Sequence, residues 1–351
     1  MGPHHLYESV PNFSEGTRAE VIAELAGAAA RAHVVDVDAD ADHNRAVISI
    51  VGEAHDLLDA LVDSARVAME HIDLREHRGV HPRVGAADVI PIVPLEGASI
   101  VDARELARAL GERIWTELKV PVYFYGHGEE HTLADIRTGR ALPALGRHEL
   151  HPSAGAVCVG ARHPLVAFNV ILPGLEPRVA RSLAASLRES GGGLRGVQAL
   201  VFELGDGRVQ LSMNLFRLEE TPPSAIIAEL ERRGVVVGSQ HVVGLCPAAF
   251  ASQAAAGRLL EARLASAVAR RGAELCARRG DDENVGLAGR LEVEAAELAR
   301  TGIDRDALLG AAMRAAALVP VLTAAGVLGD ELRTMLDIAV RGLRSAALRT
   351  D

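Results

Sequence analysis

A dense group of polar side chains falls between a helical pattern and an apolar run, in the stretch from His71 to Pro94. The group comprises His77, Arg78, His81, Arg83 and Asp88, with Gly79 and Gly85 on either side of the central turn. A tight turn between two packed elements is a place where a rigid scaffold can present reactive groups to a substrate. The stretch is therefore the first candidate for a site of chemistry.

His81 is the leading candidate for proton transfer within this group. Imidazole has an unperturbed pKa of about 6.5, so it can accept and return a proton near neutral pH. Pro82 follows His81 and restricts its backbone to extended conformations, which would hold the ring in one direction. A histidine that only makes structural hydrogen bonds is the alternative interpretation.

Four aspartates, Asp36, Asp38, Asp40 and Asp42, alternate at the end of a predicted strand. Alternation puts them on one face while the chain stays extended, so they could bind a divalent metal or orient a cationic partner. A solvated acidic loop is the simpler interpretation. Arg45 and Arg83 could supply local positive charge for anionic substrates.

Residues His127 to His131 fit H-x-x-E-H, the inverted zinc-protease pattern. The segment directly follows a predicted strand, contains Gly128 and has no evident third ligand, so we expect a solvated helix start. The glycine-rich run at 191–196 joins a helix to a strand, the reverse of the order in phosphate-binding loops. We expect that run to be a flexible connector.

The elements that must position these groups follow a repeated order. Strand, helix, strand, strand, helix and strand are predicted at 6–10, 17–31, 34–38, 46–51, 55–72 and 88–93, followed by a helix at 102–118 and a strand at 120–125. The order partly recurs as an apolar strand run at 157–172, a helix at 177–190, a hairpin at 197–204 and 209–215, a helix at 221–234 and a strand at 235–244. The predicted fold class is α+β, with two ferredoxin-like (split βαβ) subdomains and a cleft between them.

After residue 248 the composition shifts to Ala, Leu, Arg and Glu. Helices are predicted at 254–279, 287–300, 304–319 and 329–348. The expected domains are therefore 1–172, 173–253 and a helical extension over 254–351, whose expected role is packing or oligomerisation.

Composition excludes several classes of protein. The 351 residues exceed the needs of one ordinary core, and a formal net charge of −10 argues against non-specific binding of nucleic acid. Cys158, Cys246 and Cys276 are far apart and odd in number, which suggests reduced thiols. With neither a signal-peptide pattern nor a long uninterrupted apolar run, we expect a cytoplasmic protein without a membrane span.

Several ordered blocks resemble the glutamate formimidoyltransferases, the folate-dependent formiminotransferase family that includes the first domain of formimidoyltransferase-cyclodeaminase. The blocks are VPNFSEG, VVDVDADADHNRAVISIVG, HRGVHPRVGAADVIPIVP, GARHPLVAFNV, GVQAL with VQLSMNL, and VVGSQHVVGLCP. They keep the family's order across most of the chain before the helical extension.

The resemblance implies transfer of the formimidoyl group from N-formimidoyl-L-glutamate to N5 of tetrahydrofolate, a co-substrate, by a homodimer that needs no metal. It implies that His81 is the general base and then acid, and that Asp38 orients it or holds the cationic amidine. The positions implied for substrate and folate binding are Arg83, Arg162, His163, Phe168, Asn169, Asn214 and Gln240.

Two departures from the family pattern leave the donor open. Val80 stands where the family usually has Glu, and residues 146–149 replace an Asp-x-Gly-Pro element. Folate-dependent formyl transfer from N-formylglutamate or 5-formyltetrahydrofolate is an alternative in the same class. A zinc hydrolase using His127 and His131, and a folate-binding homologue without catalysis, are the alternatives from other classes.

Overall fold

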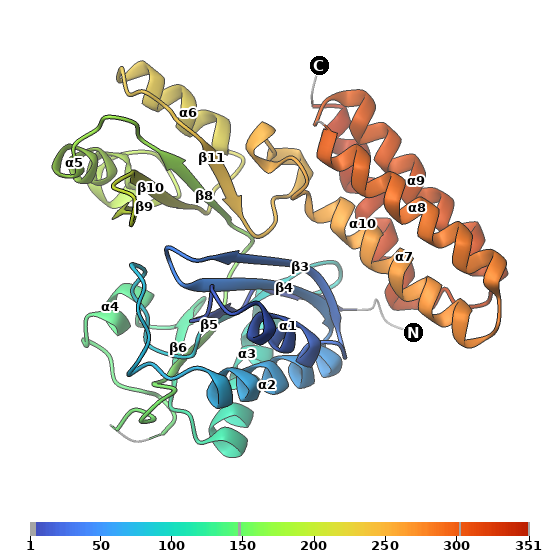
Figure 1. The fold of residues 1–351 in the computed structure, drawn as a ribbon, viewed down its shortest axis with the longest axis horizontal. Coiled ribbons are helices and arrows are strands. Elements are labelled where there is room, and N and C mark those ends of the chain that lie inside the picture. The colour runs from blue at the N-terminus through green and yellow to red at the C-terminus, as the bar shows by residue number, and fades with distance from the viewer. Residues whose placement is uncertain (1–4, 147–148, 302, 350–351) are drawn as a thin grey trace. The chain divides into compact units, whose positions relative to one another are not determined.

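The computed structural model describes residues 5–146, 149–301 and 303–349. The chain divides into two compact units, Met1–Pro164 and Leu165–Asp351, each with its own sheet (Figure 1). The sequence analysis predicted a boundary after residue 172, whereas the structure divides after Pro164. The reason is that the strand that follows Pro164 pairs within the second sheet. Each unit is described by itself below.

The sheet of the first unit is mixed. Its strands are β1 (Leu6–Ser9), β2 (Asn12–Phe13), β3 (His33–Asp40), β4 (Arg45–Glu53), β5 (Ala87–Pro94), β6 (Val122–Gly126) and β7 (Val157–Ala161). β1 and β2 both lie between β4 and β5, so the spatial order is β3, β4, β1 with β2, β5, β7 and β6. β5, β7 and β6 run parallel, whereas the other pairs are antiparallel.

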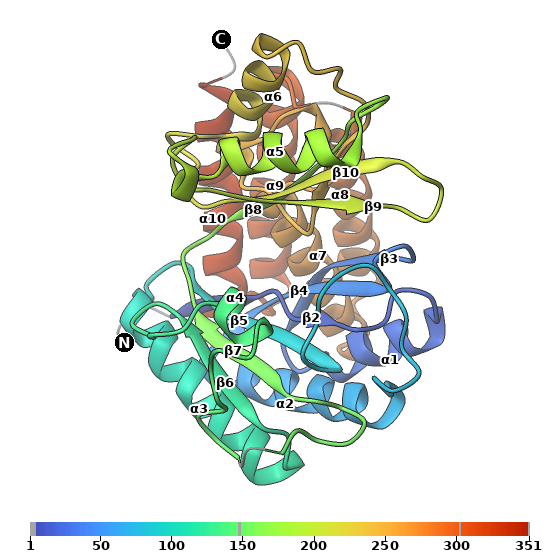
Figure 2. The same ribbon diagram turned by 90° about the vertical axis from the view of Figure 1, so that its left-hand side faces the viewer.

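Three helices cover one face of this sheet: α1 (Ala19–Ala28), α2 (Ala54–His71) and α3 (Ile100–Leu118) (Figure 2). Alternation along the strands decides which side chains face them. Ile48, Ile50 and Ile90 are buried against these helices. The short helix α4 (Leu133–Arg137) packs on the opposite face, where Ile136 meets a cluster that contains Val89 and Cys158.

The predicted split βαβ order is confirmed by β1, α1, β3, β4, α2 and β5, while the two-residue strand β2 was not predicted; α3, β6 and β7 extend the order. One strand assignment was wrong. The apolar run over 157–172 is two strands, because β7 ends at Ala161 and residues 162–165 include Pro164, which cannot donate to a ladder. β7 belongs to the first sheet, between β5 and β6.

The second unit contains a four-stranded antiparallel sheet with the order β11, β8, β10, β9. Its elements are β8 (Val166–Ile171), α5 (Pro177–Leu187), β9 (Val197–Glu203), β10 (Val209–Leu215), α6 (Pro223–Arg232) and β11 (Gln240–Val243). This succession and strand order are the ferredoxin-like arrangement that the sequence predicts. The glycine run after α5 forms a short 3-10 turn and leads into β9.

The C-terminal helices are α7 (Leu260–Arg278), α8 (Asp282–Thr301), α9 (Arg305–Ala324) and α10 (Asp330–Ala347). Leu308 of α9 and Leu343 of α10 belong to the same buried cluster as Phe168 of β8, so this extension and the second sheet share a core. The predicted end of α9 at residue 319 was wrong, because the helix passes through Pro320. α9 is long and apolar enough to cross a membrane by length and composition, properties that core helices of soluble proteins share.

Candidate active site

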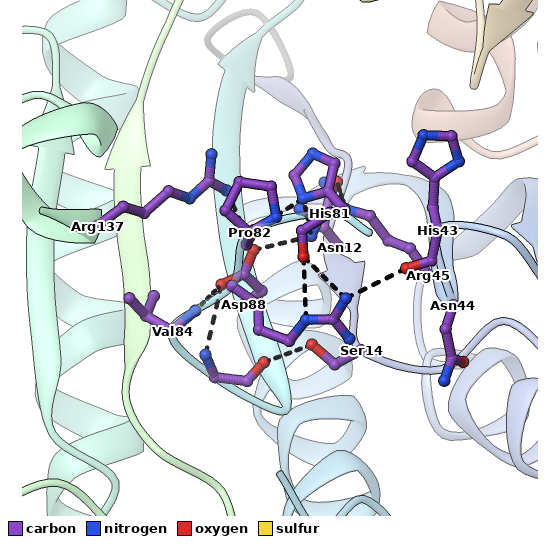
Figure 3. Close-up of polar contacts among 12 residues, drawn as sticks. Asn12, Ser14, His43, Asn44, Arg45, His81, Pro82, Val84, Asp88 and Arg137 are labelled. Carbon is purple, nitrogen blue, oxygen red and sulfur yellow. Dashed lines mark hydrogen bonds and ion pairs between the residues drawn. The ribbon is translucent and has the colours of Figure 1, made fainter. Parts of the chain in front are cut away.

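The polar group predicted from the sequence gathers on the face of the first sheet opposite α1, α2 and α3. Side chains from β2, β4, β5, α4 and the turn at residues 77–85 converge there (Figure 3). Arg45 projects to this face because Ile48, three positions further along β4, faces the helix-covered core and side chains alternate between the two faces of a strand. The site is thus assembled from segments that are distant in the sequence.

Asp88 lies at the centre of the group, and its side chain is fully buried. Its Oδ1 accepts backbone hydrogen bonds from Val84 at 2.6 Å and Gly85 at 3.4 Å. Its Oδ2 accepts from Arg45 Nη1 at 2.9 Å and Arg137 Nη2 at 3.2 Å. Burial alone would raise the pKa of Asp88, but the two guanidinium groups and the backbone donors outweigh it and hold the pKa below the ordinary value. Asp88 is therefore a carboxylate that fixes both arginines and the turn.

His81 contacts two groups through the same ring nitrogen. Its Nδ1 lies 2.7 Å from the Pro82 carbonyl oxygen and 3.2 Å from Arg45 Nη1. The carbonyl only accepts, so that contact needs a hydrogen on Nδ1, whereas the guanidinium only donates and needs a lone pair there. The shorter contact favours Nδ1–H, which places the basic lone pair of the neutral ring on Nε2.

The surroundings of His81 keep its ring neutral. Burial lowers the pKa of His81 well below its ordinary value, and the positive charges of Arg45 and Arg137 lower it further. A neutral imidazole with its lone pair on Nε2 is the form that a general base requires. The imidazolium formed by proton uptake would then face two guanidinium groups.

This arrangement predicts the protonation state of His81 directly. In protein labelled with nitrogen-15 histidine, we expect the His81 signals to report Nδ1–H and a bare Nε2 from pH about 7.5 to pH about 5.5, because its pKa is lowered. The spectrum of His81→Gln assigns the signals. A charged ring at pH about 6.5, or a hydrogen on Nε2 in the neutral ring, would contradict the geometry.

The segment at residues 10–16, part of a family-like block, braces the site. Asn12 Oδ1 accepts from Arg45 Nε at 2.9 Å, and Ser14 Oγ donates to the Gly85 carbonyl at 2.7 Å. Glu15 accepts from the backbone N–H groups of Thr17 and Arg18, each at 2.9 Å, ahead of α1. The polar residues of this segment therefore hold the arginine and the turn rather than add a reactive group.

Arg83 stabilises the turn that carries His81. Its guanidinium donates to the His81 carbonyl at 2.8 Å and 3.1 Å and to the His43 carbonyl at 3.3 Å, and it contacts the His77 ring. A side chain on Gly79 would collide with the His43 carbonyl at 2.5 Å, so the turn is closely packed. The substrate-binding role expected of Arg83 stays a prediction, and these contacts give it a positioning role.

Asp38 lies on β3 opposite Val47 of β4, and Asp40 lies opposite Arg45, so both aspartates share a sheet face with Arg45. Asp40 pairs with His43 Nδ1 at 3.0 Å, and this hydrogen bond lowers the pKa of Asp40 to about 2. The His43 and His81 ring centres are 6.2 Å apart. The location suits the expected role of Asp38 beside a cationic amidine, and that role stays a prediction.

Arg162 and His163 follow β7 at the end of the first unit. Arg162 donates to the His163 carbonyl at 3.0 Å and hydrogen-bonds Tyr125, and its burial lowers the pKa of the guanidinium. The His163 ring is exposed, with its centre 6.3 Å from that of His127. These contacts do not test the expected roles of Arg162 and His163 in folate binding, which stay predictions.

The other residues expected to bind folate lie in the second unit, on different faces of its sheet. Asn169 is directly opposite Ser212 and His241, and Asn214 is opposite Ala167 in the same ladder, so these residues share the face away from the buried cluster. His241 and Ser212 share this face with Asn169, although the sequence prediction did not include them; alternation around the buried Val242 and Met213 indicates their position.

Two residues of that predicted set do not fit a ligand-binding role on this face. Phe168 is fully buried in the core of the second unit, so it offers no surface to a ligand. Gln240 lies opposite Val170, which puts it on the other face from Asn169. The burial of Phe168 gives it a role in the core, as is usual for an aromatic residue on the inner face of a strand, and its predicted role in folate binding stays a prediction.

The zinc-protease pattern is not arranged on a helix. Residues 127–131 form a turn before α4, and Glu129 accepts from Arg104 Nε of α3 at 3.0 Å. Among the described residues no three His, Cys, Asp or Glu side chains are grouped as a metal site. Of the two departures from the family pattern, the first, Val80, has an exposed side chain. In the second, residues 146–149, Arg147 and His148 lie outside the described residues.

Comparisons with known proteins show which proteins the chain resembles. The family described as the formiminotransferase domain, N-terminal subdomain, matches residues 6–162. The chain is 35% identical over 267 residues to a glutamate formimidoyltransferase of Streptococcus pyogenes serotype M1, covering 69% of this chain and 89% of the relative. It is 37% identical over 267 residues to the glutamate formimidoyltransferase of Thermoplasma acidophilum, covering 69% and 88%. Rat formimidoyltransferase-cyclodeaminase is 37% identical over 273 residues, covering 69% of this chain and 50% of that protein.

Proposed function

The chain belongs to the formiminotransferase family, a family of one-carbon transferases, and we propose that it moves the formimidoyl group from N-formimidoyl-L-glutamate to N5 of tetrahydrofolate. The products would be 5-formimidoyltetrahydrofolate and L-glutamate. The observation that carries the proposal is the placement of His81, whose Nδ1 lies 2.7 Å from the Pro82 carbonyl oxygen. Burial and two guanidinium groups lower its pKa and favour the neutral ring.

His81 would act twice in the reaction. Nε2 takes the proton from the N5 amine as N5 bonds to the amidine carbon, and a tetrahedral intermediate forms. The imidazolium then returns the proton to the glutamate nitrogen as the bond from that nitrogen to the same carbon breaks. One group can serve both steps because the first step leaves it in the acid form that the second requires.

The protein supports both steps by fixing geometry and charge. The Pro82 carbonyl accepts from Nδ1 and keeps the ring oriented as the proton moves on Nε2. Asp38, on the sheet face of Arg45, would hold the positively charged amidine. Asn169 and Asn214 offer amide donors and acceptors on one face of the second sheet, which suits the edge of a pterin ring.

The proposal is tested by supplying different one-carbon donors. With tetrahydrofolate present, we expect N-formimidoyl-L-glutamate to release glutamate at least about tenfold faster than N-formylglutamate, since the amidinium but not the formamide can pair with Asp38. Release that does not depend on tetrahydrofolate would point to a hydrolase. Preference for N-formylglutamate, or one-carbon release from 5-formyltetrahydrofolate alone, would replace the proposed donor.

Assembly and location are separate proposals. We propose a homodimer in the cytoplasm, as the family resemblance suggests. Sedimentation equilibrium tests the dimer, since a monomeric mass across micromolar concentrations would refute it. Fractionation of the source cells tests the location.

A further inference from the structure

In the candidate site, one carboxylate, Asp88, faces two positively charged guanidinium groups. The guanidinium groups of Arg45 and Arg137 share one carboxylate oxygen, Asp88 Oδ2, at 2.9 Å and 3.2 Å. Two guanidinium groups against one carboxylate leave these three side chains with one positive charge in excess. A buried or half-buried charge needs a counter-ion, because its desolvation is costly.

Asp88 has no capacity left to balance the second arginine. Its two oxygens already accept four hydrogen bonds, two from backbone N–H groups and two from arginines. A carboxylate has about four lone-pair sites, so these contacts occupy them. Asp88 can therefore accept no further hydrogen bond, and an additional anion would have to bind the arginines directly.

Arg137 is the arginine with donors to spare. Arg45 also binds Asn12 and faces His81, and its side chain is 10% exposed. Arg137 donates through Nη2 to Asp88, and among the described residues its buried Nε has no hydrogen-bond partner. The Arg137 side chain is 19% exposed, so part of it can be reached from solvent.

The position of Arg137 relative to His81 limits what the anion can be. Both side chains attach to the same network, His81 through Arg45 and Arg137 through Asp88, and Figure 3 shows them on the same side of that carboxylate. In an N-formimidoyl amino acid, the α-carboxylate is attached to the carbon that bears the reacting nitrogen. When that nitrogen is near His81, the α-carboxylate must also be near, whereas the γ-carboxylate of a glutamate can lie further away.

We propose that Arg137 binds the α-carboxylate of the one-carbon donor and so selects an α-amino acid derivative as substrate. The inference rests on the proposed function and adds to it the residue that determines donor specificity. It also links binding to proton transfer. The anion offsets the positive charge that lowers the pKa of His81, so the bound donor itself favours the imidazolium that the reaction forms.

The kinetic test compares N-formimidoyl-L-glutamate with its α-carboxamide and its γ-carboxamide in wild type and Arg137→Gln. We expect the wild type to prefer the acid over the α-carboxamide by roughly 10-fold to 100-fold in kcat/KM, because a hydrogen bond to a charged group is lost. In Arg137→Gln that preference should fall to within about threefold, while the preference over the γ-carboxamide stays as in the wild type. Arg140→Gln, an exposed arginine just after α4 that pairs with Asp135 at 3.3 Å, is the matched control and should behave as wild type.

A binding measurement separates this inference from the proposed reaction. Calorimetric titration with L-glutamate and with its α-carboxamide, both without turnover, should show about a tenfold or larger preference for L-glutamate that Arg137→Gln removes. That result with no transfer by the wild type would refute the proposed function and keep the site. If Arg137→Gln lost affinity equally for L-glutamate and for its α-carboxamide, the inference would be overturned, since Arg137 would then act only through Asp88. A fall in tetrahydrofolate affinity with the donor preference unchanged, or no binding of L-glutamate by the wild type, would also overturn it.

Discussion

We expect His81→Gln to lower kcat for formimidoyl transfer by roughly 10²-fold to 10⁴-fold, the range that removal of a general acid–base group gives. Glutamine is close in size to histidine and can still donate to the Pro82 carbonyl, but it cannot take up a proton on the substrate side. The measurement is steady-state release of glutamate in the presence of tetrahydrofolate. KM should change little, because the imidazole is proposed to act on the reacting atoms and not to hold the substrate.

The matched control is His131→Gln, in the H-x-x-E-H segment before α4. Its kcat should remain within about threefold of the wild type, because the proposed transfer does not use this segment. An inactive His131→Gln together with an active His81→Gln would support the zinc hydrolase alternative and refute the proposed role of His81. Calorimetric binding of tetrahydrofolate by His81→Gln shows whether the variant is still folded around its site.

The second large effect concerns Asp88. Asp88→Ala would leave the guanidinium groups of Arg45 and Arg137 without their carboxylate and the N–H groups of Val84 and Gly85 without an acceptor. Breaking a buried ion pair by removing one partner costs about 3–5 kcal/mol. We therefore expect the free energy of unfolding of the first unit to fall by that amount.

Urea unfolding followed by tryptophan fluorescence measures this effect in the right unit. Trp115 is the single tryptophan of the sequence, and it packs against the core of the first unit. The control is Asp63→Ala, since Asp63 is an exposed partner of Arg31 at 3.7 Å and such a pair contributes about 0–1 kcal/mol. A loss for Asp88→Ala no larger than for Asp63→Ala would mean that Asp88 does not hold the site together.

The sequence predicted the βαββαβ order of both units because hydrophobic alternation and helical spacing depend on local burial. It could not place β7, since parallel pairing with β5 and β6 is set by contacts between segments far apart in the chain. The continuation of α9 past Pro320 also depends on contacts with other segments of the chain. A proline usually ends a helix, but packing of α9 on its neighbours can offset the lost hydrogen bond.

Sequence reasoning found the core of the site where its residues are close together in the chain. His81 and Arg83 lie in one turn and Asp88 lies at the start of β5 just after it, and Arg45 was noted as a source of positive charge. Arg137 was missed because only the packing of α4 against the sheet brings it to Asp88. The Pro82 carbonyl was missed as a partner of His81, because a backbone contact leaves no mark in residue types.

The most direct test of the proposed function follows the transferred carbon itself. N-formimidoyl-L-glutamate labelled with carbon-13 in the formimidoyl group is incubated with tetrahydrofolate and the wild-type protein, and the label is followed by NMR. We predict that the label moves to N5 of the folate and that one glutamate is released for each folate modified. Label that stays on the donor, or that appears as formate or formamide without passing to the folate, would contradict the assignment of this chain as a glutamate formimidoyltransferase.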